Sequence, residues 1–223
     1  MTKITVKGVE VQGQDGSFGI DTIERFILDA GSDHLPTFGG KFEGGVQIQQ
    51  VPDEIAPCIH AILDSGEPIV RYLEIGSAAG GSAFIINHYF KPKTIVLVDN
   101  NQHPKAHIRP YILRDIPHDE IIGNSHDEGT VGRIREMDML FDVMMIDGDH
   151  FYEGVKADIE NYAEFLRSGG LLIFHDSQIG KPYGCYQVFQ ELKTDSRWEL
   201  IGEFVSSKYQ PCGIGLFRKA GDE

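Results

Sequence analysis

From residue 69 onward the chain alternates short, almost wholly apolar runs with longer segments of helical periodicity. The apolar runs occupy 69–76, 94–99, 119–125, 141–148 and 171–176, and the helical segments occupy 80–90, 128–137, 152–170 and 183–193. Strands this apolar are buried on both faces, which is typical of a parallel sheet covered by helices on each side. Two further strands, 198–205 and 213–219, follow after a short polar connection and are expected to pair antiparallel. The pattern predicts an α/β fold with a doubly wound, mostly parallel, seven-stranded sheet.

The first 66 residues lack this alternation and are expected to form an N-terminal appendage to a domain of residues 67–223. Residues 4–12 alternate like a short edge strand. Two helices are predicted: one at 21–31, where Asp21 and Glu24 have capping-box spacing, and one at 52–66. Between them, residues 34–50 carry four glycines without helical periodicity, which favours a long loop that closes over a ligand as a lid.

Ligands of doubly wound sheets bind outside the carboxyl ends of the strands, so the polar residues there are the candidates for chemistry. The first strand ends in LEIGSAAGGS, whose glycines allow a tight turn and a close approach of backbone to ligand. A dinucleotide fingerprint needs a glycine where this chain has Ala78, whereas Glu74 suits a positively charged amino or sulfonium group. Asp99 ends the next strand and is placed to accept hydrogen bonds from the ribose of an adenosine.

Acids and histidines also follow two neighbouring strands, at Asp147, Asp149 and His150 and at His175 and Asp176. Consecutive parallel strands lie side by side, so these groups should converge. Uncompensated like charges would raise a carboxylate pKa, and a bound cation would remove that conflict. Asp149 has a second interpretation, as an N-cap of the helix that follows.

Three motifs in order, LEIGSAAGGS, the acid of VLVDNN, and IIGNS, resemble those of the class I S-adenosylmethionine-dependent methyltransferases over roughly residues 69–220. In that family the glycine loop packs on the methionine half of the cofactor, the acid holds the ribose, and residues after the third strand line the adenine. The resemblance implies a set of cofactor-binding residues: Glu74, Gly76, Ser77, Gly80, Ser82, Asp99, Asn100, Asn124 and Ser125.

Residues 146–177 resemble more specifically a metal-dependent branch that includes macrolide sugar O-methyltransferases and cephalosporin-hydroxylase-like proteins. This resemblance implies a divalent cation on Asp147, His175 and Asp176, and catalysis by His150 as base together with Asp147. The branch usually has Glu-Asp where this chain has His175 and Asp176, and catechol-type relatives have Asp-Asn, which would place Ser177 at the amide position. Mg²⁺ is the expected ion, or Mn, Fe or Zn if the imidazole of His175 is a ligand.

The expected function is S-adenosylmethionine-dependent, metal-assisted methyl transfer to a hydroxyl of a small molecule, a catechol or a sugar diol, as in natural-product tailoring. Two alternatives stay open. A Rossmann-type NAD oxidoreductase would explain Gly76 and Asp99 but would leave Asp147 and Asp176 without a purpose. A non-catalytic cofactor-binding protein of the same fold is the second alternative, and it would give His150 no function.

Amino-acid composition limits the classes of binding partner and the cellular location that are expected. With 34 acidic and 20 basic residues the formal net charge is −14, which argues against nucleic acid and against an anionic membrane surface. Three cysteines without CxxC spacing indicate reduced thiols and a cytoplasmic protein. No apolar run approaches a membrane span. His103, His107, His118 and His126 lie in polar connections and are expected to be solvated, and Trp198 is expected in the core. A homo-oligomer stays open.

Overall fold

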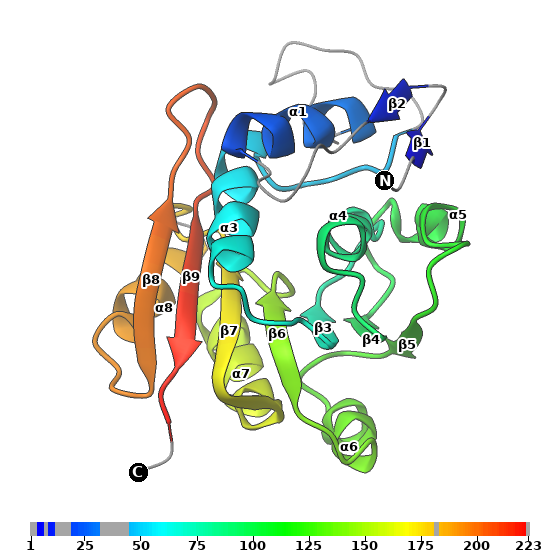
Figure 1. The fold of residues 1–223 in the computed structure, drawn as a ribbon. Helices are drawn as coiled ribbons and strands as arrows, with labels where there is room; N and C mark the ends of the chain where they lie inside the picture. Colours follow the sequence, from blue (N-terminus) through cyan, green and yellow to red (C-terminus); the bar gives the residue numbers. More distant parts are fainter. Residues whose placement is uncertain (1–3, 7–8, 12–18, 32–44, 181–182, 222–223) are drawn as a thin grey trace.

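A computed structural model describes residues 4–6, 9–11, 19–31, 45–180 and 183–221, and its centre is a seven-stranded sheet (Figure 1). The strand order is β5-β4-β3-β6-β7-β9-β8, in which the first five are parallel and β9 is antiparallel to both neighbours. The strands are β3 (Arg71–Ile75), β4 (Thr94–Asp99), β5 (Asp119–Ile122), β6 (Phe141–Ile146), β7 (Leu166–His175), β8 (Trp198–Phe204) and β9 (Ile214–Lys219). The predicted mostly parallel, seven-stranded sheet is confirmed, including its antiparallel final pair.

The sheet is buried on both faces because its central strands are mostly apolar. On β6, Val143 and Met145 pack into one core while Met144 and Ile146 pack into the other. Helices α1 (Ile20–Ala30), α3 (Pro52–Asp64) and α4 (Gly81–Phe90) contribute to the first core, near α5 (Arg109–Ile112). Helices α6 (Glu128–Glu136), α7 (Tyr152–Tyr162) and α8 (Cys185–Leu192) contribute to the second. Helices therefore cover both faces, as a doubly wound fold requires.

Strand β7 begins earlier than the sequence pattern indicated. The predicted helix over 152–170 ends at Tyr162, and a short 3-10 turn at Ala163–Phe165 leads directly into the strand. Leu166 pairs with Phe141, and the register then shifts before Leu171 pairs with Val143. Gly169, at φ 71°, lies in this irregular stretch, so the residues that looked like the end of a helix form an irregular strand entry.

The N-terminal appendage contains a small hairpin of β1 (Ile4–Val6) and β2 (Val9–Val11), followed by α1 and α3. The single edge strand predicted over 4–12 is therefore two paired strands. The predicted capping box is also wrong, because α1 begins at Ile20 with Gly19 as its N-cap. Glu24 is buried instead in an ion pair with Lys208, 2.7 Å from Oε2 to Nζ. The boundary at residue 66 stays a prediction.

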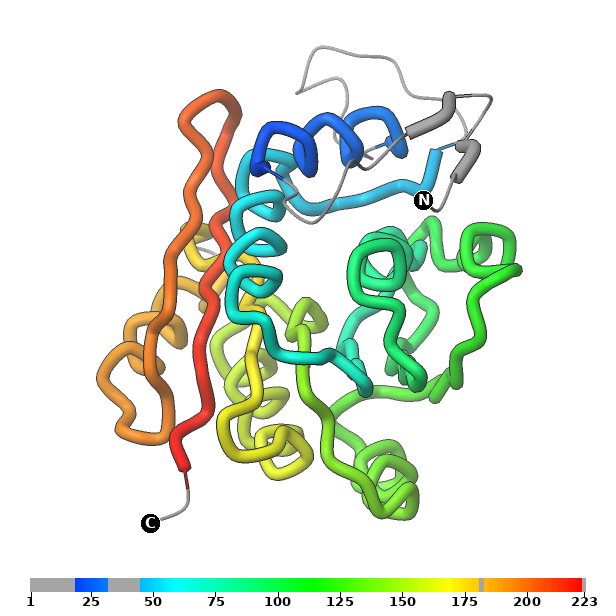
Figure 2. The backbone as a smooth tube through the Cα atoms, viewed as in Figure 1, coloured from blue at the N-terminus to red at the C-terminus, as the bar shows by residue number. Residues whose placement is uncertain are grey.

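Residues 45–51 run back alongside α1 to the start of α3 (Figure 2). Val46 and Ile48 donate backbone hydrogen bonds to the carbonyls of Ala30 and Gly31, and both side chains are buried. Most of the predicted lid, namely residues 34–44 of 34–50, lies outside the described residues. The described end of that segment packs on the core.

Trp198 is buried, as predicted. Among the helices of the described chain, none has the length and apolarity to cross a membrane.

His88 of α4 connects the appendage to the sheet domain. Its ring stacks on Phe26 of α1 with centroids 3.9 Å apart and planes 16° apart. Its Nδ1 is buried without a hydrogen-bond partner in the described structure. Burial, together with the charge of Lys91, lowers the pKa of His88 to about 4, so the ring is neutral in the folded protein at neutral pH.

We predict that His88 makes the protein lose stability between pH 6.5 and pH 4. In that window the unfolded state takes up a proton on His88 and the folded state does not, which favours unfolding by at most about 1.4 kcal/mol per pH unit. The variant His88→Phe keeps the stack without the titration. In urea unfolding from pH 7 to pH 4.5, the free energy of unfolding should therefore fall less steeply with pH in the variant than in the wild type. The exposed His107→Asn is the control, and parallel curves for wild type and His88→Phe would contradict the assignment.

Candidate functional site

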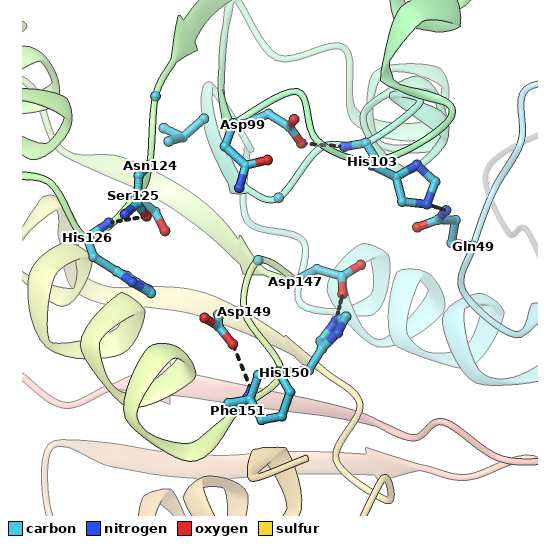
Figure 3. Close-up of a pocket in the computed structure, with 16 residues that line it drawn as sticks. Gln49, Asp99, His103, Asn124, Ser125, His126, Asp147, Asp149, His150 and Phe151 are labelled. Atoms are coloured by element: carbon cyan, nitrogen blue, oxygen red, sulfur yellow. Dashed lines mark hydrogen bonds and ion pairs between the residues drawn. The ribbon is translucent and has the colours of Figure 1, made fainter. Parts of the chain in front are cut away.

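A cavity of about 360 Å³ opens at the carboxyl edge of the parallel strands (Figure 3). Residues after β3, β4, β5 and β6 form its wall, together with Gln49 from the appendage. Backbone hydrogen bonds extend the sheet into this region: Gly76 N donates to Val98 O, Asp147 N to Ile75 O and Gly123 N to Asp99 O, at 2.8, 2.8 and 3.0 Å. The volume of the cavity lies in the range of small-molecule binding sites.

The glycine loop after β3 packs directly on the end of β6. Gly76 has φ 86°, and a Cβ there would lie 2.0 Å from the carbonyl oxygen of Asp147, so only glycine fits. Gly80, at φ 83°, is the N-cap of α4. This close approach of two strand ends makes the floor of the cavity a continuous stretch of backbone.

Asp99 and Arg109 hold the glycine loop in place. The carboxylate of Asp99 accepts hydrogen bonds from Ala78 N at 2.8 Å and Asn101 N at 2.6 Å. The buried guanidinium of Arg109 donates to Ser77 Oγ and Ala78 O, and its Nη1 lies 3.6 Å from Asp99 Oδ1. Arg109 was not predicted as part of the site, because no local sequence pattern marks an arginine in a polar connection as buried.

The predicted cofactor-binding residues fall into two groups. Five line the cavity: Gly76, Asp99, Asn100, Asn124 and Ser125. The other four, Glu74, Ser77, Gly80 and Ser82, are not part of its wall. Glu74 is fully buried and accepts hydrogen bonds from the hydroxyls of Tyr72 and Ser82, and burial raises its pKa to about 7. Contact of these four residues with a cofactor stays a prediction.

At one end of the cavity, two carboxylates and two imidazoles meet, as the order of strands predicted. His175 Nδ1 lies 2.9 Å from Asp147 Oδ1 and 3.3 Å from Asp176 Oδ1. His150 Nε2 lies 3.1 Å from Asp176 Oδ2 and 3.5 Å from Asp147 Oδ1. We call Asp147, His150, His175 and Asp176 the acid–histidine cluster.

A left-handed turn brings two consecutive residues into this cluster. Side chains of adjacent strand residues normally point to opposite faces of a sheet. Strand β7 ends at His175, and Asp176 then adopts φ 61°, a conformation that aspartate tolerates better than most residues. Both side chains consequently take part in the cluster, where His175 contacts Asp147 and Asp176 contacts His150.

The charges of the cluster shift the pKa values of Asp147, His150 and His175. Burial alone would raise the pKa of Asp147, but the charge of His175 and the contact with His150 hold it below its usual range. Burial alone would lower the pKa of His175, yet Asp147 and Asp176 raise it to about 10. The hydrogen bond with Asp147 raises the pKa of His150. The imidazole of His175 therefore carries positive charge opposite the carboxylates of Asp147 and Asp176.

These residues fit a divalent cation. Ligand atoms of Asp147, His150 and Asp176 all lie within 4.8 Å of one another, and so do those of His175, Asp176 and Cys212. His175 Nε2 is buried and has no hydrogen-bond partner in the described chain. Carboxylate oxygen and imidazole nitrogen together suit Zn, Mn or Fe as well as Mg.

Two glutamines of the segment 45–51 were missed by the sequence analysis. Gln50 is 3% exposed and donates from Nε2 to Asp147 Oδ2 at 2.7 Å. Gln49 reaches His103 Nε2 with its side-chain nitrogen at 2.8 Å (Figure 3). Alternation of Val46 and Ile48 with these polar residues was the available signal, hidden by the glycines before it.

Three of the four histidines expected to be solvated are half-buried instead and contact other side chains. His103 meets Gln49, His118 Nε2 lies 3.0 Å from Glu120 Oε1, and His126 Nε2 lies 3.2 Å from the buried Asp158 Oδ1. Only His107 is exposed as expected. His103 and His126 also line the cavity, because the connections that carry them fold over the sheet edge.

Asp149 does not cap α7. Its Oδ1 accepts a hydrogen bond from Phe151 N at 2.8 Å, and Phe151 itself is the N-cap. The carboxylate lies close to Gly154, where a Cβ would be 2.2 Å from it.

Comparisons with known proteins agree with this geometry. Residues 73–177 match the family model of a methyltransferase domain. An uncharacterised protein of Acanthamoeba polyphaga mimivirus is 26% identical over 157 residues, which is 64% of this chain and 64% of that protein. The chain thus spans a little under two thirds of this relative's length.

Two solved structures are similar in fold. The O-methyltransferase TomG of Streptomyces achromogenes, in complex with SAM, has a TM-score of 0.59 at 15% identity and covers 87% of this chain and 89% of its own. The methyltransferase MycE of the mycinamycin biosynthetic pathway, in complex with Mg and SAH, has a TM-score of 0.53 at 20% identity and covers 84% of this chain and 53% of its own. By its match to a methyltransferase domain and by its fold, the chain resembles the class I S-adenosylmethionine-dependent methyltransferases.

Proposed function

We propose that this protein transfers the methyl group of S-adenosylmethionine to a hydroxyl of a small molecule, with a divalent cation held by Asp147, His175 and Asp176. One observation carries the proposal. A single cavity has Asp99 and the glycine loop on one side and Asp147 and His150 of the acid–histidine cluster on the other. A cofactor end and a reaction end are thereby brought within one small-molecule site.

The cofactor end would hold adenosine. Asp99 uses its two oxygens for Ala78 N and Asn101 N, and each oxygen retains a lone pair for a ribose hydroxyl. Asn124 and Ser125 line the neighbouring wall, on the side where the adenine would lie. Such an arrangement would bring the sulfonium methyl near Gly76 and Asp147, next to the cluster.

At the reaction end, His150 is the group best placed to act as base. Its side chain is 39% exposed, whereas those of Asp147, His175 and Asp176 are 10% exposed or less. It is therefore the cluster member that an incoming hydroxyl can reach. In its neutral form His150 would take the hydroxyl proton as the oxygen displaces the methyl group, which leaves S-adenosylhomocysteine and a methyl ether.

Asp147 and Asp176 would orient the His150 ring, since both carboxylates contact its Nε2. A divalent cation, when bound, would make the hydroxyl more acidic and would favour an acceptor with two vicinal hydroxyls. A catechol or a sugar diol is therefore the proposed substrate class.

The remaining parts of the proposal concern partners and location. The net charge of −14 disfavours nucleic acid as a substrate. Cys58, Cys185 and Cys212 are free thiols, which fits a reducing compartment and hence the cytoplasm. An NAD oxidoreductase is not favoured, because it leaves the acid–histidine cluster without a role.

Ligand preference tests the proposed function directly. S-adenosylhomocysteine at 100 times its Kd should raise the free energy of unfolding by about 2.7 kcal/mol, seen as a higher melting temperature. NAD should leave the melting temperature unchanged. Transfer of tritium from methyl-labelled S-adenosylmethionine to catechols or sugar diols should follow, and it should weaken after chelation and recover with added Mg²⁺ or Zn²⁺. Stabilisation by NAD alone would overturn the proposal.

Asp99 should be required for cofactor affinity. Asp99→Asn should weaken S-adenosylhomocysteine binding about 10- to 100-fold, since a hydrogen bond to a charged group contributes about 1.5–3 kcal/mol. The matched control is Glu120→Gln, because Glu120 also pairs with Arg109, at 3.3 Å, but does not line the cavity. Titration calorimetry gives both affinities. Equal losses in the two variants would mean that Asp99 acts only through Arg109 and the glycine loop.

His150 should be required for turnover but not for cofactor binding. His150→Ala is expected to lower kcat by about 10²- to 10⁴-fold, the usual contribution of a general base, with unchanged affinity for S-adenosylhomocysteine. Added imidazole should restore part of the lost rate by occupying the vacated space. Asp149→Asn, next to it in the chain, is the control. Full activity in His150→Ala would remove His150 from the reaction.

A further inference from the structure

We propose that Cys212 is a thiolate ligand in the cation site, together with His175 and Asp176, so that the site binds Zn²⁺ in preference to Mg²⁺. The inference deepens the proposed function, since it identifies the class of cation at the reaction end. It does not depend on which acceptor is methylated.

The three side chains have the spacing of a metal site. Their ligand atoms all lie within 4.8 Å of one another. Around a tetrahedral zinc, ligand atoms at 2.0–2.3 Å from the metal are about 3.3–3.8 Å apart. Small side-chain adjustments would therefore suffice, and the Cys212 thiol already hydrogen-bonds to Asp176.

Backbone contacts hold Cys212 at this position. The carbonyl of Cys212 accepts a hydrogen bond from Gln178 N at 2.8 Å, and Ser177 N donates to Gly213 O at 3.1 Å. Gly213 has φ 83°, and a Cβ there would be 2.3 Å from Ser177 Oγ. The stretch before β9 is thus bound to the stretch after β7, one residue beyond Asp176.

A side chain of helix α3 also holds the backbone next to Cys212. The fully buried carboxylate of Glu54 accepts hydrogen bonds from Gly213 N and Ser206 N, both at 2.9 Å. Two independent elements therefore fix the backbone next to Cys212. A ligand carried on a chain that is held in this way is preorganised for a metal.

A second observation points to a ligand at this place. His175 is 7% exposed, and its Nε2 has no hydrogen-bond partner among the described residues. The buried Ser177 Oγ, next to Asp176 in the chain, also lacks one. Buried polar atoms without partners are uncommon in native proteins, and a bound ion would supply the partner that such an atom lacks.

The donor set decides which ion is favoured. Mg²⁺ takes oxygen ligands in near-octahedral geometry, whereas sulfur and imidazole nitrogen are typical zinc ligands. Cys212, His175 and Asp176 supply one sulfur, one nitrogen and one oxygen. A fourth zinc position is then left for Asp147 or for an oxygen of the substrate, as in catalytic zinc sites.

Cobalt substitution tests the thiolate directly. Protein freed of metal by a chelator and titrated with Co²⁺ should develop a thiolate-to-cobalt charge-transfer band in the near ultraviolet. The band should vanish in Cys212→Ser, and Zn²⁺ should be bound at least about tenfold more weakly, a loss that even outer-shell changes produce. Cys58→Ser and Cys185→Ser, which change cysteines buried in the two cores, should keep the band.

The outcomes separate this inference from the proposed function. Co²⁺ bound without the charge-transfer band, or a band that survives in Cys212→Ser, would overturn the thiolate ligand while leaving methyl transfer untouched. No binding of Co²⁺ or Zn²⁺ at all would overturn the inference and the cation together, and the tritium assay would still report methyl transfer. Circular dichroism of Cys212→Ser checks its fold, and His175→Ala, expected to lose affinity for Zn²⁺ as well, provides a second variant.

Discussion

The buried charge of Asp147 is the constraint on which the reaction end of the site depends. Its side chain is 10% exposed, and a carboxylate in that position requires compensation by hydrogen bonds and opposite charge. His175 supplies the charge at 2.9 Å, and Gln50 supplies an amide donor at 2.7 Å on the other oxygen. Removing one partner of such a buried pair typically costs about 3–5 kcal/mol. The residues around Asp147 therefore have both a structural and a chemical reason to be where they are.

Part of the compensation for the charge of Asp147 comes from the N-terminal appendage. Gln50 precedes α3, and Glu54 within α3 holds the turn that carries Gly213, while Lys208 of the same connection pairs with Glu24 of α1. These contacts join the first quarter of the chain to the last strands of the sheet. The N-terminal segment in consequence supplies Gln49 to the wall of the cavity and Gln50 as a hydrogen-bond donor to Asp147.

At the proposed cofactor end, by contrast, most contacts are made by backbone groups. Gly76 lets the loop touch the end of β6, and Asp99 and Arg109 bind the backbone amides and carbonyls of that loop. Rigid backbone suits a cofactor whose shape does not vary. The proposed reaction end, with the partly exposed imidazole of His150 and its neighbouring opposite charges, suits the movement of a proton. One sheet edge thus carries two environments that differ in charge and in exposure.

The sequence by itself determined the sheet, the glycine loop and the convergence of Asp147, His150, His175 and Asp176, because each rests on local periodicity and on the regular neighbourhood of consecutive parallel strands. Only the tertiary structure decided that Glu74 lies beneath the loop, that Arg109 is buried, and that Gln50 and Cys212 reach the acid–histidine cluster. Gln50 and Asp147 are 97 positions apart, and no local pattern encodes such a contact. The capping box predicted at Asp21 is a further example. Glu24 pairs with the distant Lys208 and does not form the local capping box with Asp21. Local patterns specify elements and their order, whereas the pairing of side chains from distant elements depends on how the elements pack, which is settled only when the whole chain has folded.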